Sequence, residues 1–310
     1  MLDYLPASAP AGRLARLGVV LDESAVGDRV AGLARLCDRA GIDTIWLSDL
    51  FGAAADPDPS VCARALEIGP TVERAVIGVF VGSGQSVAEI VSRLAAIKPT
   101  EQQRIEVTLT GPSAPEIAAA LRQTLVDRWG VRRPSVAVLL EQLEAFDRIG
   151  QIVDDVVLPG WIFPDLEAAA DEVRARAVDV GRDPTTLGVA ALVPASVGRT
   201  DAEARARADI DPVFQRVGHP EEIGLFGALE DCQDRVIALA HAGITDLRCL
   251  LPSTPDILDV IAQLTAITVG TTDVLIPGSL RSPAPPPPAG WGGRPDVPPK
   301  RPVSAGSRRR

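Results

Sequence analysis

Histidine, lysine and long apolar runs are scarce in this chain of 310 residues. It has two histidines, His219 and His241, and two lysines, Lys98 and Lys300. No window approaches the roughly 18 consecutive apolar residues that a membrane span needs. The first residues also lack the apolar core of a signal peptide. We therefore expect a cytoplasmic protein with no membrane partner.

Cysteine is sparse too, and its spacing is uninformative about metals. The four cysteines stand singly, without a C-x-x-C pair. We therefore interpret them as small buried apolar side chains, not as disulfide partners or zinc ligands. Three carboxylates, Asp22, Glu23 and Asp49, would be the alternative source of metal ligands. We predict no metal site.

A basic face is also missing from most of the chain. The net charge is −10, yet from Arg281 onward seven basic residues accompany one acidic residue. That segment carries +6, so the remainder carries −16. Nucleic-acid binding requires a basic surface. We therefore expect a small-molecule substrate and no nucleic-acid partner.

What the chain does have is one pattern repeated eight times: a short apolar run, a turn and an amphipathic stretch. Strands that alternate with helices indicate parallel pairing, because a parallel connection needs a crossover. Eight such units in about 250 residues predict a (β/α)8 TIM barrel. The absence of G-x-G-x-x-G after the first run, where the chain reads LDESAVGDR, disfavours the alternative, an open doubly wound sheet. The runs are 17–21, 43–49, 75–81, 104–110, 135–140, 154–160, 187–193 and 246–251.

Glycines at the ends of the predicted helices support the division into strand–helix units. Four predicted helices end at a glycine suited to a helix C-terminus, namely Gly41, Gly130, Gly181 and Gly243. We predict a lead-in over residues 1–13, a single barrel domain over 14–279 and a disordered tail over 280–310, which is rich in proline and arginine. The connection 199–245 is the longest, and we expect it to carry extra structure over the barrel mouth.

In a TIM barrel, ligands bind at the carboxyl ends of the strands. The residues there include few acids and neither histidine nor cysteine. Many of the others are apolar or glycine, among them Leu50, Gly82, Gly111, Gly160 and Trp161. Glycine permits close approach to the backbone, so this rim suits a flat heterocycle resembling a flavin. An acidic pair from Asp22 and Asp49 would instead favour a hydrolase or lyase.

Four segments in order resemble the luciferase-like monooxygenase superfamily. They are RVAGLARLCDRAGIDTIWLSDLF (29–51), AVIGVFVGSGQSVAEIVSRLAAI (75–97), residues 134–160 and GALEDCQDRVIALAHAGITDLRCLLP (227–252). The resemblance covers about residues 14–267. It implies a barrel that uses reduced flavin with oxygen, or the deazaflavin coenzyme F-420 as a hydride carrier. Homodimers are common in that family, which leaves a homodimer open here.

The chain departs from the family pattern at two places. The histidine that ends the second strand in the family is Leu50 here, so the proton-transfer role would pass to Asp49 or Glu141. The family's phosphate-binding Ser-Gly turn after the fifth strand is Leu140-Glu141-Gln142, and we predict Arg199 as the substitute contact. The predicted cofactor contacts are Ser48, Leu50, Gly82, Ser83, Thr110, Gly111, Gly160, Trp161, Pro194 and Arg199.

The resemblance thus predicts an oxidoreductase or monooxygenase that uses F-420 or FMN on a small organic substrate. The arginine-rich, lysine-poor composition is typical of an actinobacterial, GC-rich genome and favours F-420. The departures leave an alternative, a family member without catalysis that binds a ligand or serves as a scaffold.

Overall fold

The computed structural model of the chain describes residues 15–22, 29–48, 65, 68–82, 84–96, 105–130, 133–218, 220–253 and 256–274. All of them lie within one compact unit, Met1–Ile276. The predicted lead-in 1–13 and tail 280–310 fall outside the described residues. Within the described part, no helix is both long and apolar enough to cross a bilayer.

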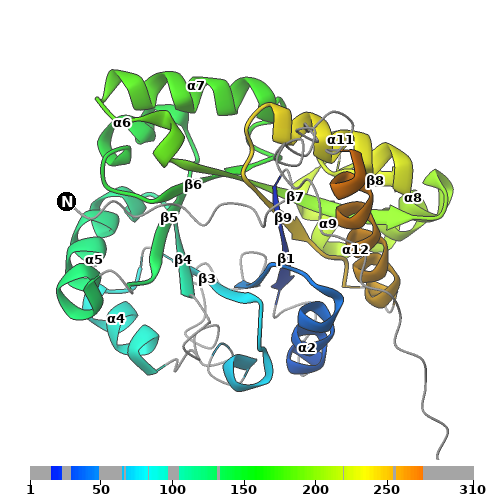
Figure 1. Cartoon of the computed structure of the whole chain (residues 1–310), viewed down its shortest axis with the longest axis horizontal. Coiled ribbons are helices and arrows are strands. Elements are labelled where there is room, and N and C mark those ends of the chain that lie inside the picture. The colour runs from blue at the N-terminus through cyan, green and yellow to red at the C-terminus, as the bar shows by residue number, and fades with distance from the viewer. Residues whose placement is uncertain are drawn as a thin grey trace, which may run out of the picture. The chain divides into compact units, whose positions relative to one another are not determined.

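Eight parallel strands close into a ring, as predicted (Figure 1). Strands β1 to β7 follow one another in sequence order, and β9 lies between β7 and β1. Pairing between β6 and β7 completes the circle. All eight apolar runs of the sequence form strands of this ring. The strands are β1 (Arg16–Asp22), β2 (Thr44–Ser48), β3 (Val76–Gly82), β4 (Ile105–Thr110), β5 (Ser135–Leu139), β6 (Asp155–Pro159), β7 (Gly188–Gly198) and β9 (Asp246–Leu250).

Strand β7 is longer than the sequence predicted. It has 11 residues, and its segment up to Pro194 pairs with β6 and β9 in the ring. Beyond Pro194, residues 195–198 pair with an additional strand, β8 (Leu225–Ala228). Sequence analysis missed β8 because it is four residues long and contains Gly227, whose φ of +123° few other residues adopt.

Helices surround the ring (Figure 1). Helix α2 shows why they form: buried Val30, Leu33, Ala34 and Cys37 repeat at the helical spacing and face the strands. It ends at Gly41, whose φ is +84°, and positive φ also confirms the other three predicted glycine endings. The helices are α2 (Val30–Ala40), α4 (Val87–Ala96), α5 (Ala114–Trp129), α6 (Phe146–Ile149), α7 (Leu166–Asp179), α8 (Asp201–Ile210), α9 (Pro212–Val217), α10 (Pro220–Ile223), α11 (Leu229–His241) and α12 (Ile257–Val274), with 3-10 turns at Gly69–Thr71, Leu143–Ala145 and Pro184–Thr186.

The cysteines that the structure describes are buried and free, as the sequence predicted. They are Cys37, Cys232 and Cys249. Burial raises the pKa of the Cys37 thiol to about 12, which keeps it protonated and unreactive near neutral pH. Cys62 lies outside the described residues.

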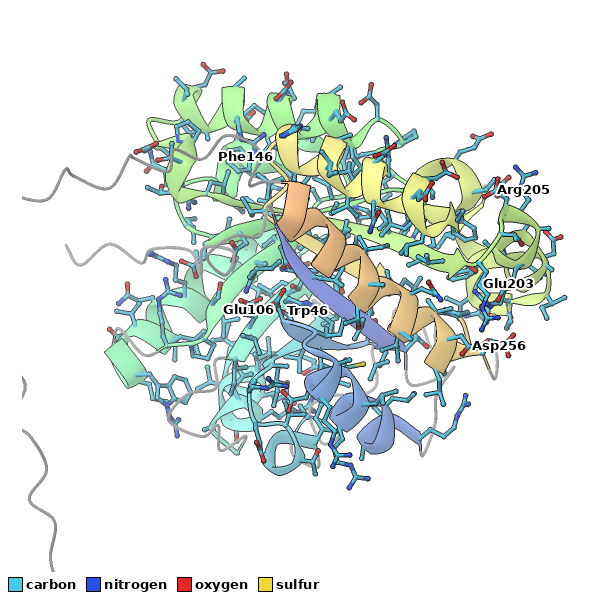
Figure 2. The ribbon with its side chains drawn as sticks, turned by 45° about the vertical axis from the view of Figure 1, so that its right-hand side comes forward. Trp46, Glu106, Phe146, Glu203, Arg205 and Asp256 are labelled. Carbon is cyan, nitrogen blue, oxygen red and sulfur yellow. The ribbon has the colours of Figure 1, made fainter. Side chains whose placement is uncertain are left out.

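The interior of the barrel changes character from one end to the other. At the amino-terminal end, Arg16 contacts Glu106 (Nη1 to Oε1, 2.7 Å) and Asp246 (Nη2 to Oδ2, 3.2 Å). The indole of Trp46 lies inside the ring from β2, and Figure 2 shows it together with Glu106. At the carboxyl end the lining is apolar, with Val20, Phe80, Leu139, Leu192 and Leu250 in one buried cluster. The ion pairs of Arg16 thus lie at the amino-terminal end, and a largely apolar floor lies beneath the rim where ligands bind.

Candidate functional site

The carboxyl ends of the strands form one rim, as the repeat predicted. Gly82 at the end of β3 stands in register beside Thr110 of β4. The amide of Gly160, just after β6, donates to the carbonyl of Leu192 in β7 (2.9 Å), two residues before Pro194. The predicted residues that the structure describes at this rim are Ser48, Gly82, Thr110, Gly111, Glu141, Gly160, Trp161 and Pro194.

Three predicted site residues, Asp49, Leu50 and Ser83, lie outside the described residues. The end of β2 just before them is described. There Ser48 is fully buried and stands in register beside Asp22 of β1. Asp22 is 2% exposed, so β1 brings a buried carboxylate to the rim.

Two rim glycines, Gly111 and Gly160, are explained by the fold without any ligand. Gly111 has φ +91°, a conformation that residues with a side chain rarely adopt. A Cβ at Gly160 would lie 3.0 Å from the backbone oxygen of Ile223 in α10. The small residue at 160 therefore admits a segment of this chain, and the close-approach argument for a ligand at these two positions loses force.

Glu141 and Arg199, the two charged residues predicted at the rim that the structure describes, follow different strands. Glu141 and Gln142 form an exposed turn after β5. A carboxylate there repels a phosphate at 4 Å by about 1 kcal/mol even in bulk water. Arg199 is exposed and follows the extension of β7, about 16 Å of extended chain beyond Pro194. Arg199 thus follows the part of β7 that pairs with β8 beyond the ring, and its role as a phosphate contact stays a prediction.

Part of the long connection 199–245, for which the sequence predicted extra structure over the mouth, packs against the apolar floor. Helix α9 buries Phe214 and Val217 in the same cluster as Leu192 and Leu250 of the barrel interior. The ring of Phe214 meets that of Phe226 in β8 edge-on, with centroids 5.5 Å apart. Burying a side chain of this size stabilises by about 1.5–3 kcal/mol. The connection after β7 therefore packs part of its apolar surface in one buried cluster with residues of the barrel interior.

The start of α9 is fixed by the fully buried Asp211. Its Oδ1 accepts hydrogen bonds from the amides of Val213 (2.9 Å) and Phe214 (3.3 Å). Its Oδ2 accepts from the amide (2.6 Å) and the hydroxyl (2.7 Å) of Ser253, just beyond β9. The start of α9 could have been predicted from the sequence, because Asp-Pro before an apolar pair is a typical helix start.

Arg207, a cation beside the rim, is already paired with neighbouring groups of the chain. Arg207 of α8 is 4% exposed and donates to the carbonyl of Val197 (3.0 Å). It pairs with Glu203 (2.9 Å) and lies 3.8 Å from Asp256, and Figure 2 shows these two acids on the same side of the molecule. The two carboxylates offset the charge of Arg207, so it is a structural cation that ties α8 to β7.

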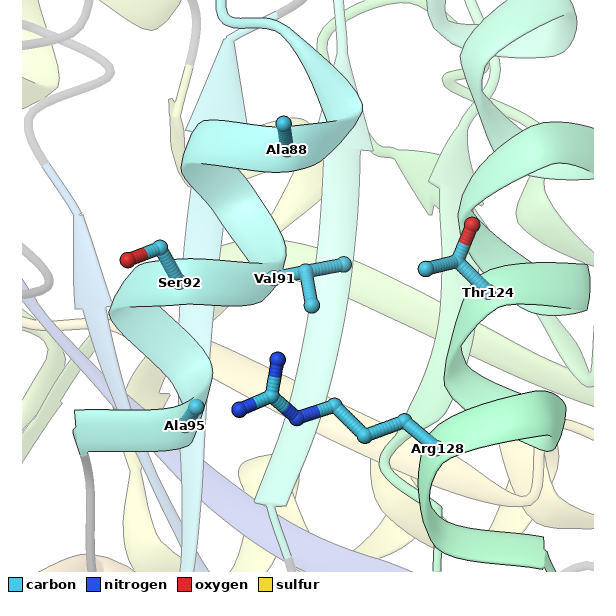
Figure 3. A pocket seen from close by; sticks show the side chains of 6 residues that line it. All are labelled: Ala88, Val91, Ser92, Ala95, Thr124 and Arg128. Carbon is cyan, nitrogen blue, oxygen red and sulfur yellow. The ribbon is translucent and has the colours of Figure 1, made fainter.

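Two hollows of the described surface lie elsewhere. One, of about 550 Å³, runs between α4 and α5 on the outside of the barrel (Figure 3). Its lining is Ala88, Val91, Ser92, Ala95, Thr124 and Arg128. The other, of about 170 Å³, is lined by Arg35, Asp38, Arg39, Thr71, Glu73 and Arg74. Neither contains a rim residue, so the rim stays the candidate site. Among the described residues, no group of three or more histidines, cysteines and acids could hold a metal ion.

Comparison with solved structures gives the same fold. The coenzyme F-420-dependent tetrahydromethanopterin reductase of Methanopyrus kandleri has a TM-score of 0.64 at 13% identity, over 83% of this chain and 99% of that one. An F-420-dependent secondary alcohol dehydrogenase in complex with an F-420-acetone adduct has a TM-score of 0.65, again at 13% identity, over 83% and 99%. The FMN complex of the oxygenating constituent of 3,6-diketocamphane monooxygenase from Pseudomonas putida has a TM-score of 0.60 at 12% identity, over 83% and 98%.

No family model and no curated protein matches the chain. The structural alignments nevertheless include most of this chain and nearly all of each neighbouring structure. The fold that the resemblance implied is confirmed: this chain has the same closed barrel as the two F-420-dependent enzymes and the monooxygenase component.

The described residues fit one part of a flavin-type group better than the other. The apolar floor, with Trp161 packed against it, fits the flat ring system of a flavin or deazaflavin. The exposed carboxylate at Glu141 does not fit a phosphate at the turn after β5. A phosphate-bearing arm would therefore need contacts at another part of the rim.

Proposed function

We propose that this protein is an oxidoreductase that acts on a small organic substrate with a deazaflavin, coenzyme F-420, or with FMN. The observation that carries the proposal is an apolar floor beneath the rim of a barrel whose structural neighbours are flavin and deazaflavin oxidoreductases. When bound, such a cofactor supplies the hydride chemistry or the activation of oxygen itself. The protein needs no nucleophile of its own, which agrees with a rim poor in histidine and cysteine.

The roles left to this chain are binding, water exclusion and proton handling. Leu192, Leu250 and Trp161 would contact the faces of the ring system and keep water away from it. The carboxyl groups predicted to hold or accept a proton are Asp49 and Glu141, and the buried Asp22 is a further acid at the same rim. Within the proposal, Ser48 and Thr110, which are buried at the ends of β2 and β4, lie where polar edges of the ring would meet the rim.

A titration of the purified protein tests the proposal. F-420 fluorescence, FMN fluorescence and the absorbance of anaerobic FMNH2 are each followed as protein is added. We expect one of the three to bind with a dissociation constant of about micromolar or tighter, equivalent to about 8 kcal/mol. Absence of binding by all three at millimolar concentration would contradict the proposal.

Two tryptophans of similar exposure make a matched pair of variants. Trp161 is half-buried at the rim and Trp129 is half-buried at the end of α5 on the outside. Trp161→Ala should weaken cofactor binding about tenfold, the loss of about 1.4 kcal/mol that one aromatic contact supplies. Trp129→Ala should leave it unchanged. Equal effects of the two would place the ligand somewhere other than the rim.

A further inference from the structure

Helix α9 belongs to the same buried cluster as the apolar floor on which the proposed function places a flat ring. Val213, Phe214 and Val217 of α9 are 4%, 0% and 6% exposed. They belong to one cluster with Leu192 and Leu250 of the barrel lining. Within the proposed function, Phe214 and the two valines therefore cover part of the floor that the ring would contact.

Helix α9 is built as a separate short unit. It has six residues, and both flanking residues have non-helical conformations: Asp211 is extended (φ −84°, ψ 118°) and Gly218 has φ +58° and ψ 137°. Before Asp211, Ile210 is 71% exposed, so α8 ends without burying its last apolar side chain. Two backbone junctions thus separate α9 from its neighbours, the arrangement expected of hinge positions.

A single carboxylate ties this unit to the rim. Asp211 accepts hydrogen bonds from Ser253, which follows β9, and so joins the start of α9 to the carboxyl end of β9. The same carboxylate caps the helix itself. Loss of the contact to Ser253 would leave the cap intact and free the helix from β9, because the two functions use different oxygens.

We propose that α9 is a self-occupying gate: it fills the ligand site of the free protein with Phe214 and leaves the mouth when a flat aromatic heterocycle binds. The inference rests on the proposed function for the identity of that heterocycle. The Asp211–Ser253 contact is the latch. Binding then requires the open form, so the apparent dissociation constant equals the intrinsic one divided by the open fraction.

The gate is tested first without any ligand. Ser253→Ala removes one of the two donors to Asp211, the hydroxyl, and keeps the amide. Loss of this one hydrogen bond to a carboxylate should weaken the latch and speed hydrogen exchange of the peptide spanning 211–218 by about tenfold. The matched control is Thr185→Val. It removes a hydroxyl that donates to Asp183 at a comparable capped turn (2.7 Å) far along the chain, and exchange of 211–218 should not change. Equal exchange in the wild type and in Ser253→Ala would overturn the latch.

Ligand addition then gives the direction of movement. In the wild type, saturating F-420 or FMN should speed exchange of 211–218, because α9 leaves the mouth, and Ser253→Ala should bind the same cofactor more tightly, by about threefold or more. Slower exchange on binding would show that α9 closes over the ligand and would overturn the gate. If neither cofactor binds, the proposed function fails, and the exchange of 211–218 in Ser253→Ala still decides whether the Asp211–Ser253 contact holds α9 in place.

Discussion

Inside the barrel, the guanidinium of Arg248 lies 3.6 Å from the ring centroid of Trp46. Both side chains are fully buried. Arg248 also donates to Asp246 (Nε to Oδ2, 3.0 Å) and to the hydroxyl of Thr108 (2.7 Å). The planar guanidinium therefore stacks on an aromatic face while its edges donate hydrogen bonds, a combination that lysine lacks.

Replacing Arg248 should be severe. Arg248→Met leaves the buried Asp246 with Arg16 as its remaining cationic partner, and breaking a buried ion pair costs about 3–5 kcal/mol. Urea unfolding measures the loss. The control is Arg176→Met: Arg176 pairs with Asp147 and Glu172 on the outer surface, and the loss there should be much smaller. Similar losses for both would mean that the interior network contributes little.

Two glycines in different surroundings give opposite predictions. A Cβ at Gly78 of β3 would overlap the indole of Trp46, whereas a Cβ at Gly32 in α2 meets nothing within 4 Å. Gly78→Ala should destabilise by about 1–3 kcal/mol through overpacking. Gly32→Ala, at an exposed helical position, should stabilise by about 0.5–1 kcal/mol. Thermal unfolding of both variants checks the pair, and a stable Gly78→Ala would show that Trp46 can move.

The charged end of the barrel interior predicts a dependence on pH. Burial, and then the negative charge of Glu106, raise the pKa of Asp155 from 3.8 to about 6, while Arg16 opposes the shift. The Asp154 charge also raises it, and the Ser135 hydroxyl, which donates to Asp155 (2.8 Å), lowers it. The folded protein therefore keeps this proton between about pH 4 and 6, where the unfolded chain has lost it. The stability that the protonated group contributes is complete below about pH 4 and is lost as the pH rises through 6.

Asp155→Asn isolates that contribution. The amide keeps a partner for Ser135 and cannot ionise, so the decline in Tm between about pH 4 and 6 should become shallower than in the wild type. Asp179→Asn, at an exposed carboxylate of α7, is the control and should follow the wild-type profile. An unchanged profile in Asp155→Asn would show that another group titrates in this range.

The turn after β5 predicts a gain of binding. Exchanging Glu141 for glycine and Gln142 for serine removes a carboxylate from the rim and should strengthen binding of F-420 or FMN by about fivefold, equivalent to about 1 kcal/mol. Riboflavin, which lacks the phosphate, is the control ligand and should respond less. A loss of affinity, or the same gain with riboflavin, would place the phosphate away from this turn.

Removal of the tail tests the predicted domain boundary. The described strands and helices all lie within Met1–Ile276. Deletion after Ser279 should therefore leave Tm nearly unchanged, because no described core residue is lost. A large decrease would show that the tail packs on the barrel.

Much of this fold could be predicted because its signals are local and repeated. Each apolar run is buried on both faces, as in a parallel barrel, and the glycine at a helix end needs only its own backbone conformation. The interior was less accessible: the Trp46–Arg248 contact joins residues about two hundred positions apart, and no local pattern records it. The mouth was misjudged in part for the same reason, since the small size of Gly160 reflects contact with Ile223, 63 residues later.

Strand β8 lies outside the ring and pairs with β7 alone. A closed barrel has no free strand edges, whereas β8 pairs on one side only. None of its four residues is exposed, and the amide of Ala228 donates to Asp201 (2.9 Å). A free edge is a template for pairing with another molecule, and natural proteins keep these strands short or twisted. Four residues, with Gly227 bending the chain, meet both conditions. The long connection after β7 thus adds a sheet edge to the barrel while keeping the risk of self-association low.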